Sequence, residues 1–183
     1  MRPGVIVLNG GSSSGKSSIA TSLQRRLEGT WLTLGIDDLI RAISHEPTDT
    51  TAGGTLEFTS GGTVVVRAPF RRAETSWYEG LAAIGRAGTG VIIDEVFLAG
   101  GESQARLRRA LEGLSVIWVG VRCQPAVAEA RELQRRDRNI GLARDQAERV
   151  HRGVSYDVVV DTSGTAPDEC SSAIVAWLND HDS

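Results

Sequence analysis

Residues 10–17 of this 183-residue chain read Gly10-Gly11-Ser12-Ser13-Ser14-Gly15-Lys16-Ser17. Two glycines five positions apart, followed by Lys and Ser, form the P-loop pattern, in which a glycine-rich turn presents backbone N–H groups to phosphate oxygens. In this pattern the lysine reaches the outer phosphates and the serine hydroxyl can contact magnesium. The stretch therefore predicts a site for a nucleoside triphosphate, with all eight residues as candidate nucleotide ligands and Ser17 as a candidate metal ligand.

The flanking residues place this loop between a strand and a helix. Val5-Ile6-Val7-Leu8 is a β-branched apolar run that leads directly into the loop. After the loop, Ile19, Leu23 and Leu27 recur every four residues, which is the spacing of one helix face. A P-loop occurs in this order of strand, loop and helix, so the flanks support nucleotide binding.

The same loop also fits the nucleophile elbow of serine hydrolases, through residues 11–15. A hydrolase needs an acid and a histidine downstream, and the only histidines are His45, His151 and His181. This alternative leaves Lys16 and Ser17 unexplained, so we favour the P-loop.

The composition is typical of one globular domain, residues 1–183. The chain is 40% hydrophobic and 23% charged, and it is long enough to bury a core without disulfides or metals. A net charge of −3 without basic patches argues against nucleic-acid binding. Cys123 and Cys170 are expected to be buried free thiols. No apolar run approaches membrane-spanning length and no cleavage region follows the amino terminus, so we expect a cytoplasmic protein with no membrane partner.

Five apolar runs read as strands, at residues 5–8, 31–36, 91–93, 116–121 and 158–160. Apolar stripes with helical spacing lie between them, around Trp77, Leu107 and Ile174. Nearly continuous apolar strands suit a sheet that helices cover on both faces. The alternation predicts an α/β fold, a three-layer P-loop kinase fold with a five-stranded parallel sheet, which binds ligands at the carboxyl ends of its strands.

Residues 46–69 interrupt this alternation. Two short apolar runs, residues 56–58 and 64–66, are joined by Thr59-Ser60-Gly61-Gly62, which predicts an inserted β-hairpin. The hairpin is either a lid or wall over a small substrate, or a surface element that serves packing or oligomer contacts.

Acidic residues follow two of the predicted strands. Asp94 stands where P-loop proteins place a carboxylate that orients magnesium, and its neighbour Glu95 is a possible substitute. Asp37 ends the second strand and could accept the proton of an attacking hydroxyl. Alternatively, either Asp37 or Asp38 caps the helix that follows, because aspartate is favoured there.

Arginines recur along the helix predicted after the fourth strand. Arg131, Arg135 and Arg138 are spaced to share one side of this helix, while the residues expected to face inward are Val127, Ala130 and Leu133. Such a row either stabilises the charge on a transferring phosphoryl group or is a solvated basic face paired with acids.

Together with the P-loop, four segments resemble the chloramphenicol 3-O-phosphotransferase family: residues 35–40, 92–98, 118–123 and 154–162. The resemblance covers nearly the whole chain. It implies an adenylate-kinase-like fold, ATP or GTP with Mg²⁺, and transfer of the γ-phosphoryl group to a hydroxyl of an antibiotic. It also implies that Asp37 is the catalytic base and that Arg135 and Arg138 belong to the lid. By fold analogy alone, Thr162 and Ser163 are expected near the purine.

Residues 44–67 depart from the chloramphenicol enzyme, with their own charged and threonine-rich content. The acceptor is therefore either chloramphenicol or another antibiotic, such as a nucleoside antibiotic. A small-metabolite kinase would share the same catalytic residues. A nucleotide-binding switch is the non-enzymatic alternative, although the guanine-selecting Asn/Thr-Lys-x-Asp motif is absent. A homo-oligomer is compatible with the sequence.

Overall fold

Five parallel strands form the centre of the fold, in the order β2-β5-β1-β6-β7. The computed structural model describes residues 4–43, 56–58, 64–134 and 141–181. The strands of the sheet are β1 (Val5–Asn9), β2 (Trp31–Gly35), β5 (Gly90–Glu95), β6 (Val116–Arg122) and β7 (Val158–Asp161). The five-stranded parallel sheet predicted from the apolar runs is confirmed, except that Ile36 begins a helix instead of ending β2.

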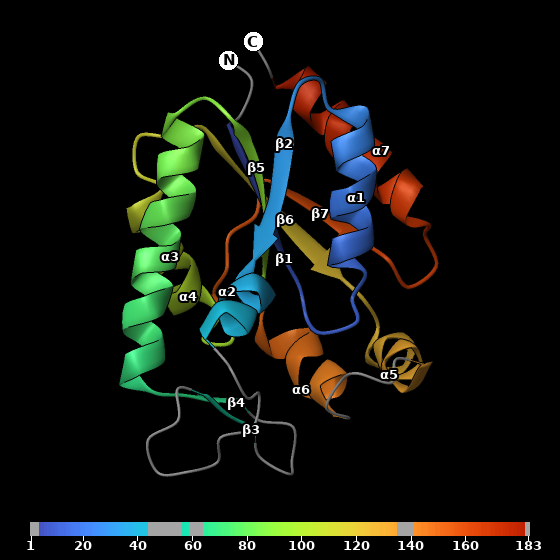
Figure 1. Ribbon diagram of the computed structural model, residues 1–183. Helices are drawn as coiled ribbons and strands as arrows, with labels where there is room; N and C mark the ends of the chain where they lie inside the picture. Colours follow the sequence, from blue (N-terminus) through green and yellow to red (C-terminus); the bar gives the residue numbers. More distant parts are fainter. Residues whose placement is uncertain (1–3, 44–55, 59–63, 135–140, 182–183) are drawn as a thin grey trace.

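Helices cover both faces of the sheet (Figure 1). α1 (Lys16–Arg26) and α7 (Pro167–Asp180) lie on one face, and α3 (Ala68–Arg86) and α4 (Gly101–Ala110) lie on the other. Ile6 and Leu8 belong to the core formed with α1 and α7, whereas Val5 and Val7 belong to the core formed with α3 and α4. Successive strand side chains point to opposite faces, so one apolar strand serves both cores and the three-layer prediction is confirmed.

Three further helices and a hairpin complete the described fold. β3 (Leu56–Phe58) pairs antiparallel with β4 (Val64–Val66), which confirms the hairpin. α2 (Ile36–Ile43) follows β2, and α5 (Pro125–Gln134) and α6 (Leu142–Arg149) follow β6. α6 was not predicted, because its sequence has little apolar periodicity.

Both cysteines, Cys123 and Cys170, are free and buried, as expected. Within the residues that the structure describes, no helix is long and apolar enough to cross a membrane.

Candidate active site

The loop between β1 and α1 needs glycine at two positions. A Cβ atom on Gly10 would lie 2.5 Å from the Val121 carbonyl oxygen of β6, closer than packing allows. Gly15 has a φ angle of 91°, in the left-handed region that glycine adopts without steric cost. These constraints hold the loop at the carboxyl end of the sheet, beside the amino terminus of α1, where free N–H groups favour anions.

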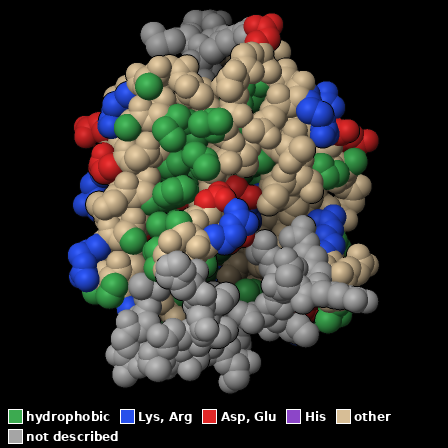
Figure 2. Space-filling view, in the orientation of Figure 1, with side chains coloured by type: hydrophobic (Ala, Val, Ile, Leu, Met, Phe, Trp, Pro, Cys, Tyr) green, Lys and Arg blue, Asp and Glu red, His purple; other side chains and the backbone are tan. Residues whose placement is uncertain are grey.

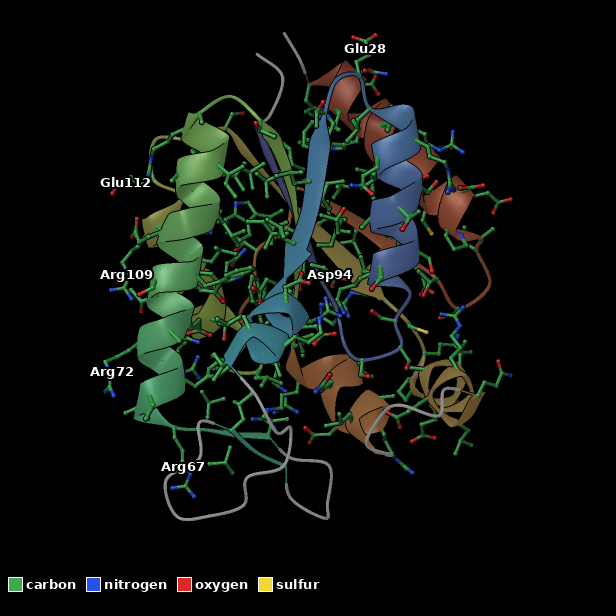
Figure 3. All side chains as sticks on the ribbon, in the orientation of Figure 1. Glu28, Arg67, Arg72, Asp94, Arg109 and Glu112 are labelled. Atoms are coloured by element: carbon green, nitrogen blue, oxygen red, sulfur yellow. The ribbon has the colours of Figure 1, made fainter. Side chains whose placement is uncertain are left out.

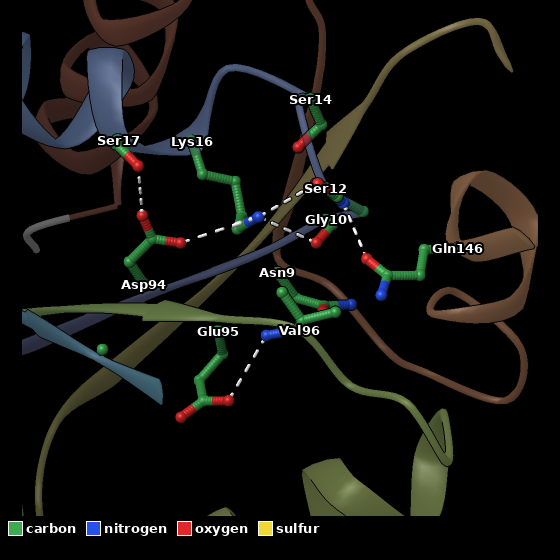
Figure 4. A network of polar contacts seen from close by, with 12 residues as sticks. Asn9, Gly10, Ser12, Ser14, Lys16, Ser17, Asp94, Glu95, Val96 and Gln146 are labelled. Atoms are coloured by element: carbon green, nitrogen blue, oxygen red, sulfur yellow. Dashed lines mark hydrogen bonds and ion pairs between the residues drawn. The ribbon is translucent and has the colours of Figure 1, made fainter. Parts of the chain in front are cut away.

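Lys16, Ser17 and Asp94 meet beside this loop (Figure 4). The Lys16 ammonium donates hydrogen bonds to the carbonyl oxygens of Gly10 and Gly11, at 2.9 and 3.0 Å, and lies 3.6 Å from Asp94 Oδ1. Ser17 Oγ donates to Asp94 Oδ2 at 2.8 Å. Figure 3 places Asp94 near the centre of the molecule, between β2 and α1. The structure thus brings the two predicted metal ligands, Ser17 and Asp94, into contact.

The polar groups of the loop fit a magnesium–phosphate ligand. The Oγ atoms of Ser12, Ser13 and Ser14 are buried and have no hydrogen-bond partner. The Ser17 hydroxyl and the Asp94 carboxylate are hard oxygen ligands of the kind Mg²⁺ takes when phosphates supply the rest of its shell. Among the described residues, no group of three or more His, Cys, Asp or Glu side chains could hold a metal ion.

Two cavities adjoin the loop. The first, here the phosphate cleft, has a volume of about 320 Å³ and is lined by all residues from Ser12 to Ser17 together with Asp94. The second, here the side cavity, has a volume of about 380 Å³ and lies between α2, the hairpin, α3 and α6. On the face drawn in Figure 2, acidic and basic side chains lie side by side near the middle of the molecule.

The two cavities share part of their walls. Five residues line both of them: Ser12, Ile36, Asp37, Arg41 and Val96. A reacting group of a molecule in the side cavity could therefore meet a phosphate in the cleft at Ser12 and Asp37. This shared wall is where a group could pass from one ligand to the other.

The Asp38 side chain caps the start of α2. Asp38 Oδ2 accepts a hydrogen bond from the backbone N–H of Gly35 at 2.7 Å, and its other oxygen pairs with Arg41. A carboxylate three residues into a helix that reaches back in this way is one half of a capping box. The capping interpretation therefore applies to Asp38, and Asp37 lies in the wall of both cavities.

Arg71 and Glu74 of α3 line the side cavity, and Arg106 of α4 contacts Glu74. Arg71 Nη1 donates to both oxygens of Glu74 at 2.9 Å, and Arg106 Nε donates to Glu74 Oε2 at 3.1 Å. Glu95 lies in the same cavity and is not a lining residue of the phosphate cleft, so it does not substitute for Asp94 beside Ser17. Burial and then the Glu74 carboxylate raise the pKa of Glu95 to about 8, which leaves it mainly protonated near neutral pH.

The face predicted for α5 is wrong at Ala130 and Leu133, whereas Val127 packs against the core as expected. Leu133 is 68% exposed and Ala130 is also exposed, while Ala128 and Glu132 are buried. Glu132 accepts hydrogen bonds from the backbone N–H groups of Gly141 and Ala143, at 2.8 and 2.9 Å. Polar tertiary partners thus decide the buried face of this short helix. Arg135 and Arg138, the predicted lid arginines, lie outside the described residues.

Arg131 and Thr162 support the P-loop from the side of β7. Arg131 Nη2 donates to the Thr162 carbonyl oxygen at 2.6 Å, and Thr162 Oγ1 donates to the Ser14 carbonyl oxygen at 2.7 Å. Ser163 Oγ accepts from the Gln124 N–H at 2.8 Å. Neither Thr162 nor Ser163 lines the phosphate cleft or the side cavity.

Gln146 is a site residue that sequence reasoning missed. Its Oε1 accepts a hydrogen bond from the Ser12 N–H at 2.8 Å, while its side chain lines the side cavity (Figure 4). A lone glutamine in a helix without a strong apolar stripe gives no local signal, because its partner is 134 residues away.

The hydrolase alternative gains no support from the described histidines. His151 Nδ1 bonds the Tyr156 hydroxyl at 2.6 Å, and His181 Nδ1 bonds the Trp177 carbonyl oxygen at 2.8 Å. Neither forms the hydrogen bond to a serine that the elbow mechanism needs. His45 lies outside the described residues.

Solved structures share this fold at low sequence identity. A sugar kinase from Janibacter sp. HTCC2649 superimposes with a TM-score of 0.69 and 20% identity, over 96% of this chain and 94% of that one. The tunicamycin resistance protein of Deinococcus radiodurans has a TM-score of 0.65 and 20% identity, over 96% and 95%. The APS kinase of Mycobacterium tuberculosis, solved with AMPPNP and APS, has a TM-score of 0.62 and 16% identity, over 97% and 98%.

The fold and the contacts among Lys16, Ser17 and Asp94 define a kinase of the P-loop class. Within this class, the chain belongs to the chloramphenicol phosphotransferase-like family, whose model matches residues 3–179. Two relatives from Mycobacterium tuberculosis, from the strains CDC 1551 and H37Rv, are provisionally named O-phosphotransferases. Each is 32% identical over 171 residues, which span 88% of this chain and 76% of the relative.

Proposed function

We propose that this protein transfers the γ-phosphoryl group of ATP or GTP to a hydroxyl of chloramphenicol or a related antibiotic, and so confers resistance. The observation that carries the proposal is the wall shared by the phosphate cleft and the side cavity, which includes Asp37. A phosphoryl donor in one cavity and a hydroxyl in the other would meet beside this carboxylate.

The residues of the phosphate cleft bind the phosphoryl donor. Backbone N–H groups of residues 11–17, except the Ser12 N–H that Gln146 accepts, hold the β- and γ-phosphates together with the Lys16 ammonium. Ser17 and Asp94 hold Mg²⁺, whose charge offsets that of the phosphates. We assign Arg135 and Arg138 to a lid over the phosphates, and Thr162 and Ser163 to the purine side. Because the donor is a nucleoside triphosphate, we place the reaction in the cytoplasm.

Asp37 acts on the acceptor as a general base. Its carboxylate accepts the proton of the acceptor hydroxyl as that oxygen bonds to the γ-phosphorus. The bond between the γ-phosphorus and the β,γ-bridging oxygen breaks, and a nucleoside diphosphate leaves. The products are a phosphorylated acceptor, the diphosphate and one proton.

The lining of the side cavity favours an uncharged acceptor with an apolar body. Apolar side chains come from α2, the hairpin, α3 and α6: Ile36, Ile40, Leu56, Val64, Val66, Phe70 and Leu142. Both arginines among the described lining residues are paired with carboxylates, Arg41 with Asp38 and Arg71 with Glu74. An anionic metabolite would therefore find no uncompensated cation among these residues, which weighs against a small-metabolite kinase for acids.

A nucleoside antibiotic is the second candidate acceptor. One structural neighbour is a tunicamycin resistance protein and another is a sugar kinase. A cavity of about 380 Å³ is large enough for a drug-sized ligand. The same cavity weighs against a switch that only binds nucleotide, since such a protein needs no second pocket.

The test is product formation by the purified protein. ATP and GTP are supplied in turn with Mg²⁺, together with chloramphenicol, tunicamycin and a panel of hydroxylated antibiotics, and the mass of each product is recorded. Addition of one phosphoryl group to any panel member supports the proposal and identifies the acceptor. Nucleotide binding without any phosphorylated product contradicts it.

A further inference from the structure

Glu95 lines the side cavity and carries a buried carboxyl group. It is the last residue of β5 and directly follows Asp94, so the two side chains leave the strand on opposite sides. In Figure 4, Asp94 points towards Lys16 and Ser17, whereas Glu95 points away from them. Glu95 is only 1% exposed, and it lines the side cavity and not the phosphate cleft.

One oxygen of this carboxyl group has no partner. Glu95 Oε2 accepts a weak hydrogen bond from the N–H of the next residue, Val96, at 3.3 Å, while Oε1 is buried without any hydrogen bond. A buried polar atom without a partner destabilises the fold, and a nonpolar side chain of the same length would avoid this cost. Stability therefore does not explain a glutamate here.

The neighbouring arginines do not serve Glu95. Arg71 donates to both oxygens of Glu74, and Arg106 donates to Glu74 Oε2 and to Ser103 Oγ at 3.0 Å. These hydrogen bonds hold the Glu74 carboxylate against α4. Among the described polar groups beside this cavity, Glu95 Oε1 is left without a partner. Burial raises the pKa of Glu95 to about 8, and a hydrogen bond donated to Oε1 by a ligand favours the ionised carboxylate, in which this oxygen is an acceptor.

We propose that Glu95 Oε1 binds a second polar group of the acceptor, an O–H or N–H other than the hydroxyl that is phosphorylated. This inference rests on the proposed function and narrows its substrate class. The acceptor has an apolar body and at least two hydrogen-bond donors, as in a diol or an amido alcohol: Asp37 engages the reacting hydroxyl and Glu95 the second donor. Glu95 is thus a residue that determines specificity without taking part in phosphoryl transfer.

The experiment compares two Glu95 variants on two acceptors. Glu95→Met removes both carboxyl oxygens at similar side-chain length, and Glu95→Gln keeps one side-chain oxygen. The first acceptor is the panel member that the wild-type protein phosphorylates, and the second is its analogue without the second donor. If chloramphenicol is the acceptor, this analogue lacks the hydroxyl at carbon 1.

We expect Glu95→Met, or loss of the second donor, to raise the acceptor KM about 10- to 100-fold, because a buried polar group loses its partner. The two changes together should cost no more than one of them, since both remove the same hydrogen bond. Glu95→Gln should keep the acceptor KM within about threefold of the wild type, and neither variant should change the nucleotide KM. The exposed Glu102→Met is the matched control and should leave both constants unchanged.

The melting temperature separates a binding role from a structural one. Glu95→Met should melt at or above the wild-type temperature, because it removes an unpartnered buried carboxyl group. A lower melting temperature with an unchanged acceptor KM would mean that Glu95 only supports the fold. The proposal would also be overturned if Glu95→Met and removal of the second donor each raised the acceptor KM and their effects on its logarithm added. If the wild-type protein phosphorylates no panel member, the proposed function itself fails. If it phosphorylates one and Glu95→Met leaves the acceptor KM unchanged, only the role of Glu95 fails.

Discussion

The phosphate cleft and the side cavity are built in different ways. The cleft takes six of its fourteen lining residues from one continuous stretch, residues 12–17, and the others from β2, α2 and the end of β5 with the residue after it. The side cavity draws its lining from seven elements: α2 and α3 give four residues each, and β3, β4, β5, α4 and α6 give one or two each. A continuous loop leaves a readable pattern in the sequence, whereas a cavity assembled from many elements does not. The donor is therefore better defined than the acceptor.

Breaking the shared wall should have the largest effect. Asp37→Asn should lower kcat about 100- to 10,000-fold, because an amide cannot accept the proton of the acceptor hydroxyl. The nucleotide should bind with nearly wild-type affinity, since Asp37 lies outside the P-loop. Steady-state kinetics and calorimetry measure the two quantities. Asp168→Asn, on the exposed side of α7, is the control, and equal kcat values in the two variants would show that Asp37 is not the base.

Gln146 tests whether the two cavities depend on one another. Gln146→Ala leaves the Ser12 N–H without its partner and detaches α6 from the loop. We expect the KM of both substrates to rise about 10-fold, because an unpartnered N–H costs about 1–3 kcal/mol. Gln24→Ala, which removes an exposed amide bonded to the Trp31 carbonyl oxygen, should change neither. A rise in only one KM would show that the cavities are independent.

The hairpin allows a change in the side cavity alone. Val66 lines the cavity, while its neighbour Val65 is 41% exposed and points away. Val66→Ala should raise the acceptor KM about three- to tenfold, the equivalent of about 1 kcal/mol of lost apolar contact, and leave the nucleotide KM unchanged. Kinetics with each substrate varied in turn make the comparison. If Val65→Ala raised the acceptor KM equally, the hairpin would not act as a wall of the side cavity.

The smallest effect concerns the support behind the P-loop. Asn9 Nδ2 donates to the Tyr156 hydroxyl at 2.6 Å, and His151 contacts the same hydroxyl. Burial and then Arg122 lower the pKa of His151 to about 4. The unfolded chain binds this proton near pH 6.5, so the free energy of unfolding should fall as the pH drops from about 6.5 to about 4.

His151→Asn should remove this pH dependence. Between pH 7 and pH 5 the wild-type melting temperature should fall by a few degrees more than that of the variant, a difference of roughly 1–2 kcal/mol. Thermal melts at both pH values provide the measurement. Parallel falls in both proteins would show that His151 does not titrate with unfolding.

The sequence predicted those parts of the fold that depend on neighbouring residues. The apolar runs located all five parallel strands. The P-loop pattern, and the expectation that ligands bind at the carboxyl ends of the strands, predicted that Lys16, Ser17 and Asp94 lie together. The boundary at Ile36 was missed because an apolar residue fits the end of a strand as well as the first turn of a helix. The choice between Asp37 and Asp38 as cap stayed open because both stand in that first turn.

Other features depend on partners that are distant in the sequence. Glu132 is buried because it binds N–H groups at the start of α6, and Arg131 turns towards Thr162, 31 residues away. The spacing of apolar residues had instead predicted that Leu133 faces the core. Gln146 and Glu95 carry no motif, and their surroundings appear only when α6, α3 and β5 are packed together.

The most direct test is a crystal structure with AMPPNP, Mg²⁺ and the acceptor found in the product assay. We expect the triphosphate in the phosphate cleft, the acceptor in the side cavity, and its reacting hydroxyl about 3 Å from an Asp37 oxygen and facing the γ-phosphorus. An acceptor bound elsewhere, or bound in the side cavity with its hydroxyl away from Asp37, would contradict transfer across the shared wall.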